Sequence, residues 1–406
     1  MSDPLVLQEH AEWAAPLCDE DFQFLHSELK QQISVRQELR EGKQLVVINP
    51  NQYVGVILLP SGLRLEIRPK VPIANLFYML SCAFEMPWPF RPEWALFQSF
   101  DDVLAAIAQI FCDLVEQRVR EGLYRAYVEQ EENRAVIRGR IVFLEDLRRN
   151  CLTRQRVYCR FADFTWDIEE NQIIRQVLHL LSGWGFYSGL RLRLSQLDSA
   201  LSEITPTAMP GAVIGHFRYN RFNEDYRPIH QLCRLFLEGN SLSEQLGILD
   251  SRTFLLDMNE LFEQFITQLL DSASRGPITI EPQSSLYLDE QDKVSMRPDI
   301  LVKCDGIPVL VADCKYKRTE SDAYKNHDYY QVLSYCIATG VRRGVLVYPR
   351  DKAATDDTVN VLNANIAIEQ MTINLGLAFS EFCIECQEFA DRLLSSVVHN
   401  ELTLAV

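Results

Sequence analysis

The sequence predicts an α/β protein: a C-terminal region with a mixed sheet flanked by helices, preceded by a β-rich N-terminal region and a mostly helical middle region. After Gly276, short apolar runs alternate with helical spacing, which indicates helices packed on a sheet. Near the N-terminus, alternating apolar and charged residues flank a Pro-Ser-Gly turn at 60–62, and helical periodicity dominates between these regions. We therefore divide the chain into 1–92, 93–245 and 246–406.

The composition limits the class of protein. Lys and Arg number 40 against 56 for Asp and Glu, a net charge of −16. This charge argues against a surface that coats nucleic acid as a whole, but it permits a local basic face. No apolar run reaches the ~18 residues of a membrane span, and the start lacks a secretory signal. We expect a cytoplasmic protein without membrane association.

The cysteines also indicate a cytoplasmic protein. There are eleven, an odd number, mostly within apolar segments, which is typical of reduced core thiols. Cys383 and Cys386 form a CxxC pair, but no second Cys or His pair lies nearby as a zinc site requires. Two core-facing thiols are the favoured interpretation.

The N-terminal region should contain strands at 45–48, 53–59 and 63–68 and a short apolar helix at 76–84. In the third strand, apolar residues alternate with charged ones, as expected where one face is solvated. The middle region should contain helices at 94–126, 167–183, 190–201 and 230–238, with a loop at 209–220.

An arginine-rich segment spans 134–160. It holds eight arginines and two acids, a local net charge of 8 − 2 = +6. Arginine favours planar, bidentate partners such as phosphate or carboxylate. The candidate DNA- or partner-binding residues are Arg138, Arg140, Arg148 and Arg149. The alternative is a solvated face paired with the acids Glu129, Glu131 and Glu132.

The C-terminal region is expected to begin with a helix at 254–270. Short strands should follow at 278–280, 286–288, 297–303 and 309–315, then a helix at 324–339 and a strand at 344–348. The strands at 297–303 and 309–315 read as a buried hairpin around an Asp-Gly turn.

This hairpin carries charges where apolar residues are expected. Asp313 and Lys315 share one face of their strand, and folding at the turn brings Asp299 nearly opposite Ala312 and Asp313. Charges in an apolar sheet are costly unless they pair or bind a metal. Clustered carboxylates suit Mg²⁺, which can activate water, while an ammonium stabilises a phosphate in reaction. A structural salt bridge of Lys315 with either acid is the alternative.

Pro298-Asp299, followed by Asp313-Cys314-Lys315, resembles the signature of the PD-(D/E)xK nucleases. Gln331 and Tyr335, at i and i+4 on the next helix, resemble the QxxxY motif of the RecB-like branch. The resemblance implies that Asp299 and Asp313 hold Mg²⁺ and that Lys315 assists the attacking water. It also implies that Gln331 and Tyr335 orient the DNA backbone.

An acid on the preceding helix often completes the metal site in such nucleases. The resemblance favours Glu263 over Glu260 for this role. An exposed helix acid is the commoner alternative.

Longer segments resemble one family more closely. "DMNELFEQF", "RPDILV", "ADCKYKR", "YYQVLSY" and "GVLVYP", in this order, look like the McrC and LlaJI family of 5-methylcytosine-dependent restriction systems, and "NLFYMLSCAF", "IRGRIVF" and "DIEENQIIRQVL" fit as well. This resemblance implies an endonuclease subunit acting on double-stranded DNA. Its N-terminal module would bind an McrB-like AAA+ GTPase hexamer and stimulate GTP hydrolysis.

The chain has no GxxxxGK[ST] phosphate loop, so GTP is expected on the partner and not here. Two other functions stay open. One is a scaffold that regulates an NTPase without cutting DNA, and the other is a stand-alone RecB-like exonuclease.

Overall fold

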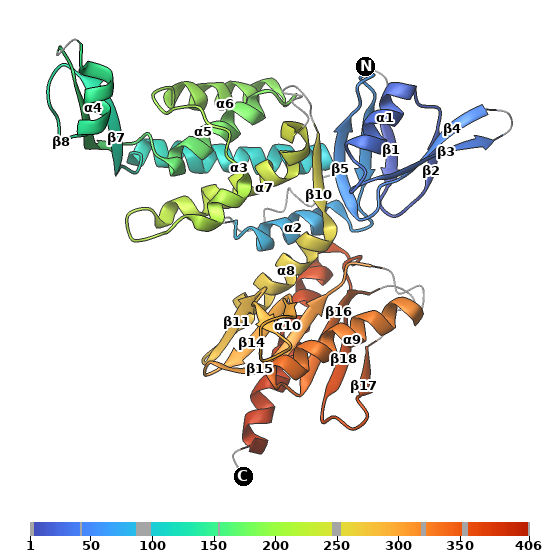
Figure 1. The fold of residues 1–406 in the computed structure, drawn as a ribbon. Helices are drawn as coiled ribbons and strands as arrows, with labels where there is room; N and C mark the ends of the chain where they lie inside the picture. Colours follow the sequence, from blue (N-terminus) through green and yellow to red (C-terminus); the bar gives the residue numbers. More distant parts are fainter. Residues whose placement is uncertain are drawn as a thin grey trace. The chain divides into compact units, whose positions relative to one another are not determined.

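The computed structural model describes residues 4–40, 43–86, 99–152, 155–245, 253–317, 322–350 and 356–404. The chain separates into two compact units, one made of Met1–Val103 with Leu242–Val406 and the other of Leu104–Ser241 (Figure 1). The predicted boundaries after residues 92 and 245 fall within or beside residues outside the described ranges. The three-part division stays a prediction.

The N-terminal part of the first unit is β-rich. Its elements are β1 (Leu5–Gln8), β2 (Trp13–Ala15), α1 (Asp19–Ser27), β3 (Ser34–Arg40), β4 (Lys43–Asn49), β5 (Tyr53–Leu58), β6 (Arg64–Arg68) and α2 (Ile73–Ala83). One sheet has the order β2-β4-β3 and the other β1-β6-β5-β10. The predicted hairpin around residues 60–62 is confirmed, since β5 and β6 pair in antiparallel register. A core that includes Leu25, Ile48 and Leu65 fills this part.

Strand β10 (Phe254–Asp257) corrects the helix expected from residue 254. These residues pair with β5, and helix α8 (Met258–Ala273) begins after them, where the Asp257 carboxylate accepts the Asn259 N–H as an N-cap. Gly55 makes this pairing possible. It has φ 140°, and a Cβ at this position would lie 2.0 Å from the Phe254 carbonyl oxygen.

The second unit is mostly helical, as predicted, but it also contains a sheet. Its elements are most of α3 (Phe100–Glu121), β7 (Ala126–Arg134), β8 (Arg140–Ile141), α4 (Phe143–Asn150), β9 (Val157–Thr165), α5 (Glu169–Ser182), α6 (Ser188–Ala200), two 3₁₀ turns at Gly211–His216 and Glu224–Tyr226, and most of α7 (Arg227–Gln245). Strands β7-β9-β8 form an antiparallel sheet against which α4 packs. The helix predicted at 94–126 ends at Glu121, and Ala126 already begins β7.

The C-terminal part of the first unit is a six-stranded mixed sheet flanked by helices, as predicted. The strands are β11 (Ile278–Pro282), β14 (Ile300–Cys304), β15 (Ile307–Cys314), β16 (Arg343–Pro349), β18 (Ala367–Ile373) and β17 (Asp357–Asn360), in this order across the sheet. A separate pair, β12 (Leu286–Tyr287) and β13 (Ser295–Met296), is antiparallel. Within the sheet, β15, β16 and β18 run parallel, and the remaining pairs are antiparallel.

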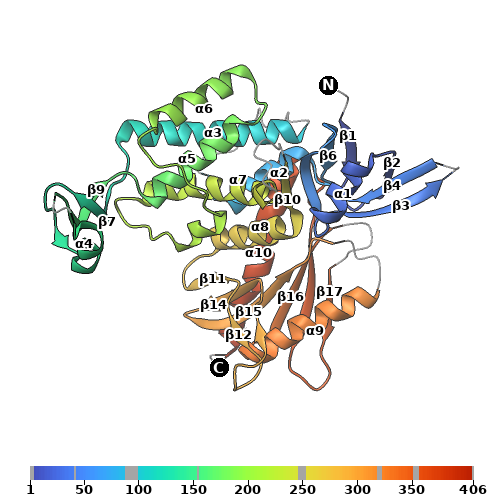
Figure 2. The ribbon, with the colours of Figure 1, turned by 45° about the horizontal axis from the view of Figure 1, so that its top comes forward.

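Helices cover both faces of this sheet. Helix α9 (Asp322–Thr339) packs on one face through Val332, Tyr335 and Cys336. Helix α10 (Phe379–Leu404) lies behind the opposite face and contacts α8 (Figure 2). The face covered by α9 carries Val311 of β15, so alternation places Asp313 on that same face.

All eleven cysteines are free thiols. In the CxxC pair, Cys386 is buried and Cys383 half-buried, as expected of thiols that face the core. Within the described ranges, no helix is both long and apolar enough to cross a membrane.

Candidate functional site

The hairpin of β14 and β15 positions the predicted acids. Ile300 pairs with Ala312, so Asp299 and Asp313, one residue beyond this pair on each strand, lie opposite one another. The turn falls on Asp305 and Gly306, whose φ values of 47° and 79° are the positive values that tight hairpin turns require. The predicted turn and the juxtaposition of the two acids are confirmed.

Polar contacts hold the two acids and the lysine together. Asp299 Oδ2 accepts a hydrogen bond from the Cys314 backbone N–H at 2.7 Å. Lys315 Nζ forms an ion pair with Asp313 Oδ2 at 2.6 Å, and the Asp313 side chain is completely buried. Cys314, between them, points its buried side chain to the other face of the sheet.

The acids are costly to ionise in this setting. Burial, and then the Asp299 carboxylate, raises the pKa of Asp313 to about 7. Burial, and then Glu263, raises the pKa of Asp299 to about 6. Burial lowers the pKa of Lys315, but the Asp313 carboxylate more than offsets this, so the lysine remains a cation.

This arrangement fits a divalent cation. The Lys315 ammonium is the partner of Oδ2, whereas Oδ1 of the buried Asp313 carboxylate accepts no hydrogen bond from the described residues. A buried carboxylate oxygen without a hydrogen bond is unfavourable, and a metal ion would relieve both that deficit and the repulsion from Asp299. Mg²⁺ is commonly held by one or two carboxylates with water in its other positions, and the hairpin offers two.

Glu263 lies on α8 within electrostatic reach of both acids, because its charge acts on Asp299 and the charge of Asp313 acts on it. Burial raises its pKa, and Gln283 Nε2 donates to its Oε1 at 2.6 Å. Glu260 instead accepts a hydrogen bond from Gln264. Among the described residues, no three Asp, Glu, His or Cys side chains gather closely enough to hold a metal, so Glu263 does not complete a preformed three-carboxylate cage.

Gln331 and Tyr335 lie on α9, above the same face as the acids. Gln331 Nε2 donates to the Tyr335 hydroxyl at 2.7 Å, and that hydroxyl donates to the Arg297 carbonyl at 3.3 Å. Burial raises the pKa of Tyr335, and the charges of Asp313 and Asp299 act on it. The structure therefore brings the predicted helix pair to the predicted hairpin.

Comparison with known proteins agrees with this geometry. A family model described as "McrBC 5-methylcytosine restriction system component" matches residues 48–349, about three quarters of the chain. The chain belongs to this family. The resemblance of the longer segments to the McrC-type family is thereby confirmed. Comparison with curated protein sequences gives no match.

Solved structures similar to this McrBC-family chain come from Thermococcus gammatolerans. One is a chain of the half-complex of McrB AAA+ hexamers with bound McrC, with 18% identity and a TM-score of 0.55; the match covers 97% of this chain and 100% of that one. Another is from the McrBC complex, with 20% identity, a TM-score of 0.41 and coverage of 68% and 89%. The first likeness supports the same overall α/β fold.

Sequence reasoning missed a second polar cluster beside the site of this McrBC-family protein. Asp328 of α9 is buried, forms an ion pair with Lys317 Nζ at 2.7 Å, and accepts the Tyr348 hydroxyl at 2.6 Å. Its charge acts on both Asp313 and Lys315. One sequence signal was available, because Asp328 lies three residues before Gln331 and so near it on the helix surface.

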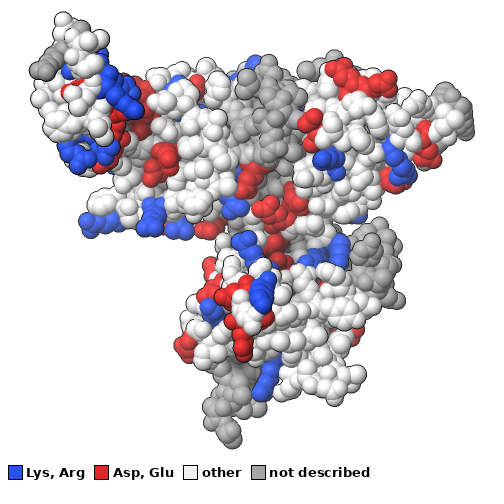
Figure 3. Space-filling view, in the orientation of Figure 1, with Lys and Arg blue, Asp and Glu red and all other residues white. Residues whose placement is uncertain are grey.

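The predicted arginines lie in the second unit and not on the hairpin. Arg138 pairs with Asp163 at 2.7 Å, while Arg148 and Arg149 both pair with Glu145. Arg140 begins the short strand β8. Figure 3 shows basic side chains gathered over the lobe of β7–β9 and α4.

The alternative of a solvated, ion-paired face is confirmed for part of this segment. Arg160 pairs with Glu131 and Arg134 with Glu132 on the sheet surface. Such pairing does not preclude binding, since exposed ion pairs are weak and exchange readily for a partner's charges.

Proposed function

We propose that this protein is the Mg²⁺-dependent DNA endonuclease subunit of a GTP-driven, modified-cytosine-dependent restriction complex, with a nuclease domain of the PD-(D/E)xK type. The observation that carries the proposal is the buried Asp313 carboxylate. It lies opposite Asp299, its Oδ2 is ion-paired to Lys315, and its Oδ1 accepts no hydrogen bond from the described residues. The salt bridge with Lys315 alone leaves Oδ1 under-satisfied, whereas a metal site would use this oxygen.

Each residue of the site has a role that follows from its surroundings. Asp299 and Asp313 would hold Mg²⁺, with Glu263 reaching it directly or through water. The ion, when bound, supplies an activated water and neutralises charge on the phosphate. Lys315 keeps its proton, because its pKa is raised, and stabilises negative charge on the phosphate oxygens. Gln331 and Tyr335 position the strand from α9.

The proposed partner is an McrB-like AAA+ GTPase hexamer that binds the GTP. The similar Thermococcus gammatolerans structure contains McrB hexamers with bound McrC, which supports this choice. We expect the module of residues 1–92 to contribute to binding of the motor, and this chain to stimulate its GTPase.

The lobe of β7–β9 and α4 is a further candidate contact for the motor. Helix α4 exposes Phe143, Leu144 and Leu147 at 71%, 79% and 65% beside Arg148 and Arg149. Exposed apolar side chains gathered on one short helix are typical of a protein interface, and arginine is common there. Arg138 and Arg140 lie in the same lobe and are our candidates for contacts with DNA or with the GTPase.

Plasmid cleavage tests the proposal. The purified chain is mixed with its McrB-type GTPase and with supercoiled plasmid carrying methylated cytosine. We expect nicked or linear product only when Mg²⁺, GTP and both proteins are present. Stimulated GTP hydrolysis without cleavage would identify a scaffold, and degradation of DNA ends without GTP or partner would identify an exonuclease. Either result would overturn the proposal.

A further inference from the structure

A second site lies beside the candidate nuclease centre, within the first unit. It is a pocket of about 210 Å³. We call it the basic pocket, and its polar lining consists of His10, Lys70, Tyr316, Lys317, Arg350 and Asn374. It is smaller than the ~300 Å³ at which ordinary small-molecule sites begin, so it suits a compact group.

The lining of the basic pocket is electropositive. Lys70, Lys317 and Arg350 line it, and among the residues that the structure describes no aspartate or glutamate does. Three cations thus line one small pocket in a chain with a net charge of −16. Low-dielectric walls strengthen their field inside the pocket, which favours an anion there.

Acids outside the pocket lining contact the residues that carry these cations. Lys317 pairs with buried Asp328 at 2.7 Å. The buried Glu9 accepts the Lys70 backbone N–H at 2.6 Å, and the charge of Lys70 acts on its carboxyl group. Neither acid lines the pocket, so Asp328 orients the Lys317 ammonium without occupying the space an anion would take.

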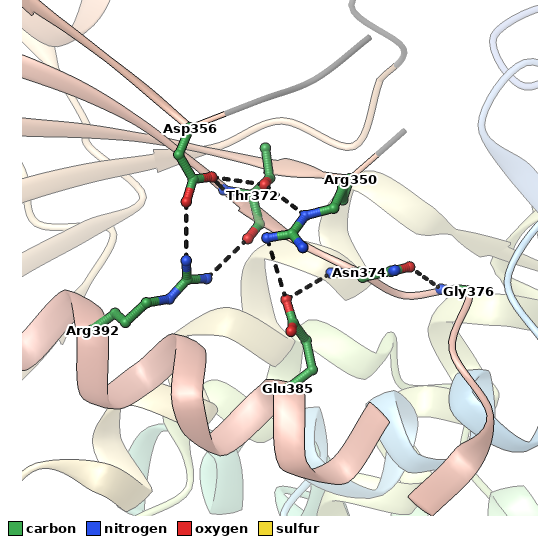
Figure 4. A network of polar contacts seen from close by, with 7 residues as sticks. All are labelled: Arg350, Asp356, Thr372, Asn374, Gly376, Glu385 and Arg392. Atoms are coloured by element: carbon green, nitrogen blue, oxygen red, sulfur yellow. Dashed lines mark hydrogen bonds and ion pairs between the residues drawn. The ribbon is translucent and has the colours of Figure 1, made fainter. Parts of the chain in front are cut away.

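Arg350 is held in the same way. Figure 4 shows its guanidinium between two neighbours: Nε donates to Thr372 Oγ1 at 3.1 Å, and an amino nitrogen lies 3.8 Å from a carboxylate oxygen of Glu385. The Glu385 side chain is 15% exposed against 40% for Arg350, so the acid lies deeper and the cation faces solvent. Asn374 N–H also donates to Glu385, which fixes the strand end that forms this wall.

Two lining residues of the basic pocket adjoin the candidate nuclease site along the chain. Tyr316 and Lys317 directly follow Lys315, and the Lys317 N–H donates to the Lys315 carbonyl at 3.0 Å. Asp328, which holds Lys317, also acts electrostatically on Asp313. The pocket and the candidate nuclease site are thus linked through Lys317 and Asp328.

We propose that the basic pocket binds a backbone phosphate of the DNA strand near the phosphate that is cut. The proposal rests on the proposed nuclease function and adds a position for the substrate strand. A phosphodiester matches the chemistry of the pocket, because it is anionic, as the three cations require, and compact enough for the small volume of the pocket. Binding here would set how the strand lies across Asp299 and Asp313.

The test measures binding of a fluorescent DNA duplex by anisotropy, using the full chain in EDTA at several salt concentrations. The variant is the double substitution Lys70→Gln/Arg350→Gln. It removes two cations from the pocket but keeps the backbone N–H of residue 70, which donates to Glu9. Each lost phosphate contact should weaken binding roughly 8-fold at 0.1 M salt and lower the slope of log K against log salt by about 0.9. The charge-preserving Lys70→Arg/Arg350→Lys variant should bind like the parent.

Arg392→Gln is the matched control, because Arg392 belongs to the polar network of Figure 4 but does not line the pocket. It should leave affinity and salt slope unchanged. Thermal unfolding of each variant verifies that it is folded. Duplex binding is also measured with added inorganic phosphate and with chloride at equal ionic strength. This comparison distinguishes a pocket that binds a DNA phosphate from one that binds only a free anion.

Absence of duplex binding by the parent, even at low salt, would overturn the proposal. Equal affinity and equal salt slope for the parent and the Gln variant would also overturn it. So would a Gln variant that loses only the competition by inorganic phosphate and binds the duplex like the parent. Because EDTA prevents cleavage, this readout is independent of catalysis. Failure of plasmid cleavage would remove the proposed function, whereas unchanged binding by the Gln variant would remove only the basic pocket.

Discussion

The hydroxyl of Tyr316 donates a hydrogen bond at 2.8 Å to the carboxyl group of Glu9, which is completely buried. Tyr316 directly follows the candidate catalytic Lys315, while Glu9 directly follows β1. Burial raises the pKa of Glu9, and its Oε2 accepts no hydrogen bond from the part of the chain that the structure describes. This pair ties the N-terminal sheet to the loop that carries the lysine.

Removing one hydroxyl should therefore destabilise the protein. Tyr316→Phe leaves the buried Glu9 carboxyl group with one hydrogen-bond donor fewer, at a cost of about 1–3 kcal/mol. Chemical denaturation measures the free energy of unfolding. Tyr287→Phe is the control, because Tyr287 is 46% exposed on β12 and should cost less than about 0.5 kcal/mol. Equal effects of the two changes would show that the pair does not stabilise the fold.

The two site acids predict a pH dependence. Burial raises the pKa of Asp313 to about 7 and that of Asp299 to about 6, so the folded protein holds protons that the unfolded chain releases. Their contribution to stability is present below about pH 3.8 and is lost as pH rises through about 6 and 7. In EDTA, Asp313→Asn should show a shallower loss of stability between pH 4 and 7 than the parent.

Magnesium should reverse this trend. The ion binds the ionised carboxylates, so the rise in melting temperature on adding Mg²⁺ should grow as pH increases from 5 to 8. Thermal unfolding with Mg²⁺ or with EDTA measures this difference. A rise that is independent of pH, or that persists unchanged in Asp313→Asn, would place the ion elsewhere.

Asp328 should act as a positioning residue. Asp328→Asn removes the charge that holds Lys317 while keeping the shape of a side chain that is 2% exposed. We expect a loss of about 1–3 kcal/mol in stability and a lower cleavage rate that is not abolished. Tyr348→Phe should reproduce part of the stability loss without removing the charge. Wild-type stability and cleavage in Asp328→Asn would exclude this role.

The apolar side chains of α4 should matter for assembly and not for folding. Leu144 is 79% exposed, so Leu144→Ser should change the free energy of unfolding by less than about 0.5 kcal/mol. It should weaken binding to the motor partner, which co-sedimentation measures. Leu192→Ser, at a 60% exposed site on α6, is the control and should bind normally. Equal partner binding by both variants would exclude α4 as a contact.

The hairpin could be predicted from the sequence because its signals are local. An Asp-Gly turn between two apolar runs sets the register, and the register places Asp299 opposite Asp313. Gln331 and Tyr335 follow from helical spacing on the next element. Charged residues in an otherwise apolar hairpin are conspicuous in a single sequence.

Other features depend on contacts between distant segments. The residues of β10 were predicted to start a helix. Their pairing with β5 depends on the absence of a side chain at Gly55, some 200 residues away, which no local sequence pattern shows. Strand β7 carries three glutamates, and its sheet lies mostly at the surface, so it lacks the apolar alternation of a core strand. The lining of the basic pocket comes from segments that lie far apart in the sequence, so no local pattern predicts it.

Cleavage by the complex containing Asp313→Asn tests the account most directly. The variant keeps the shape of the side chain but loses the carboxylate that would bind Mg²⁺, and Asp271→Asn, on an exposed part of α8, is the matched control. With the GTPase partner, GTP and Mg²⁺, we expect Asp313→Asn to lose DNA cleavage while still binding the partner and stimulating GTP hydrolysis. Cleavage at the parent rate by the pure Asp313→Asn complex would contradict the assignment of this hairpin as the nuclease centre.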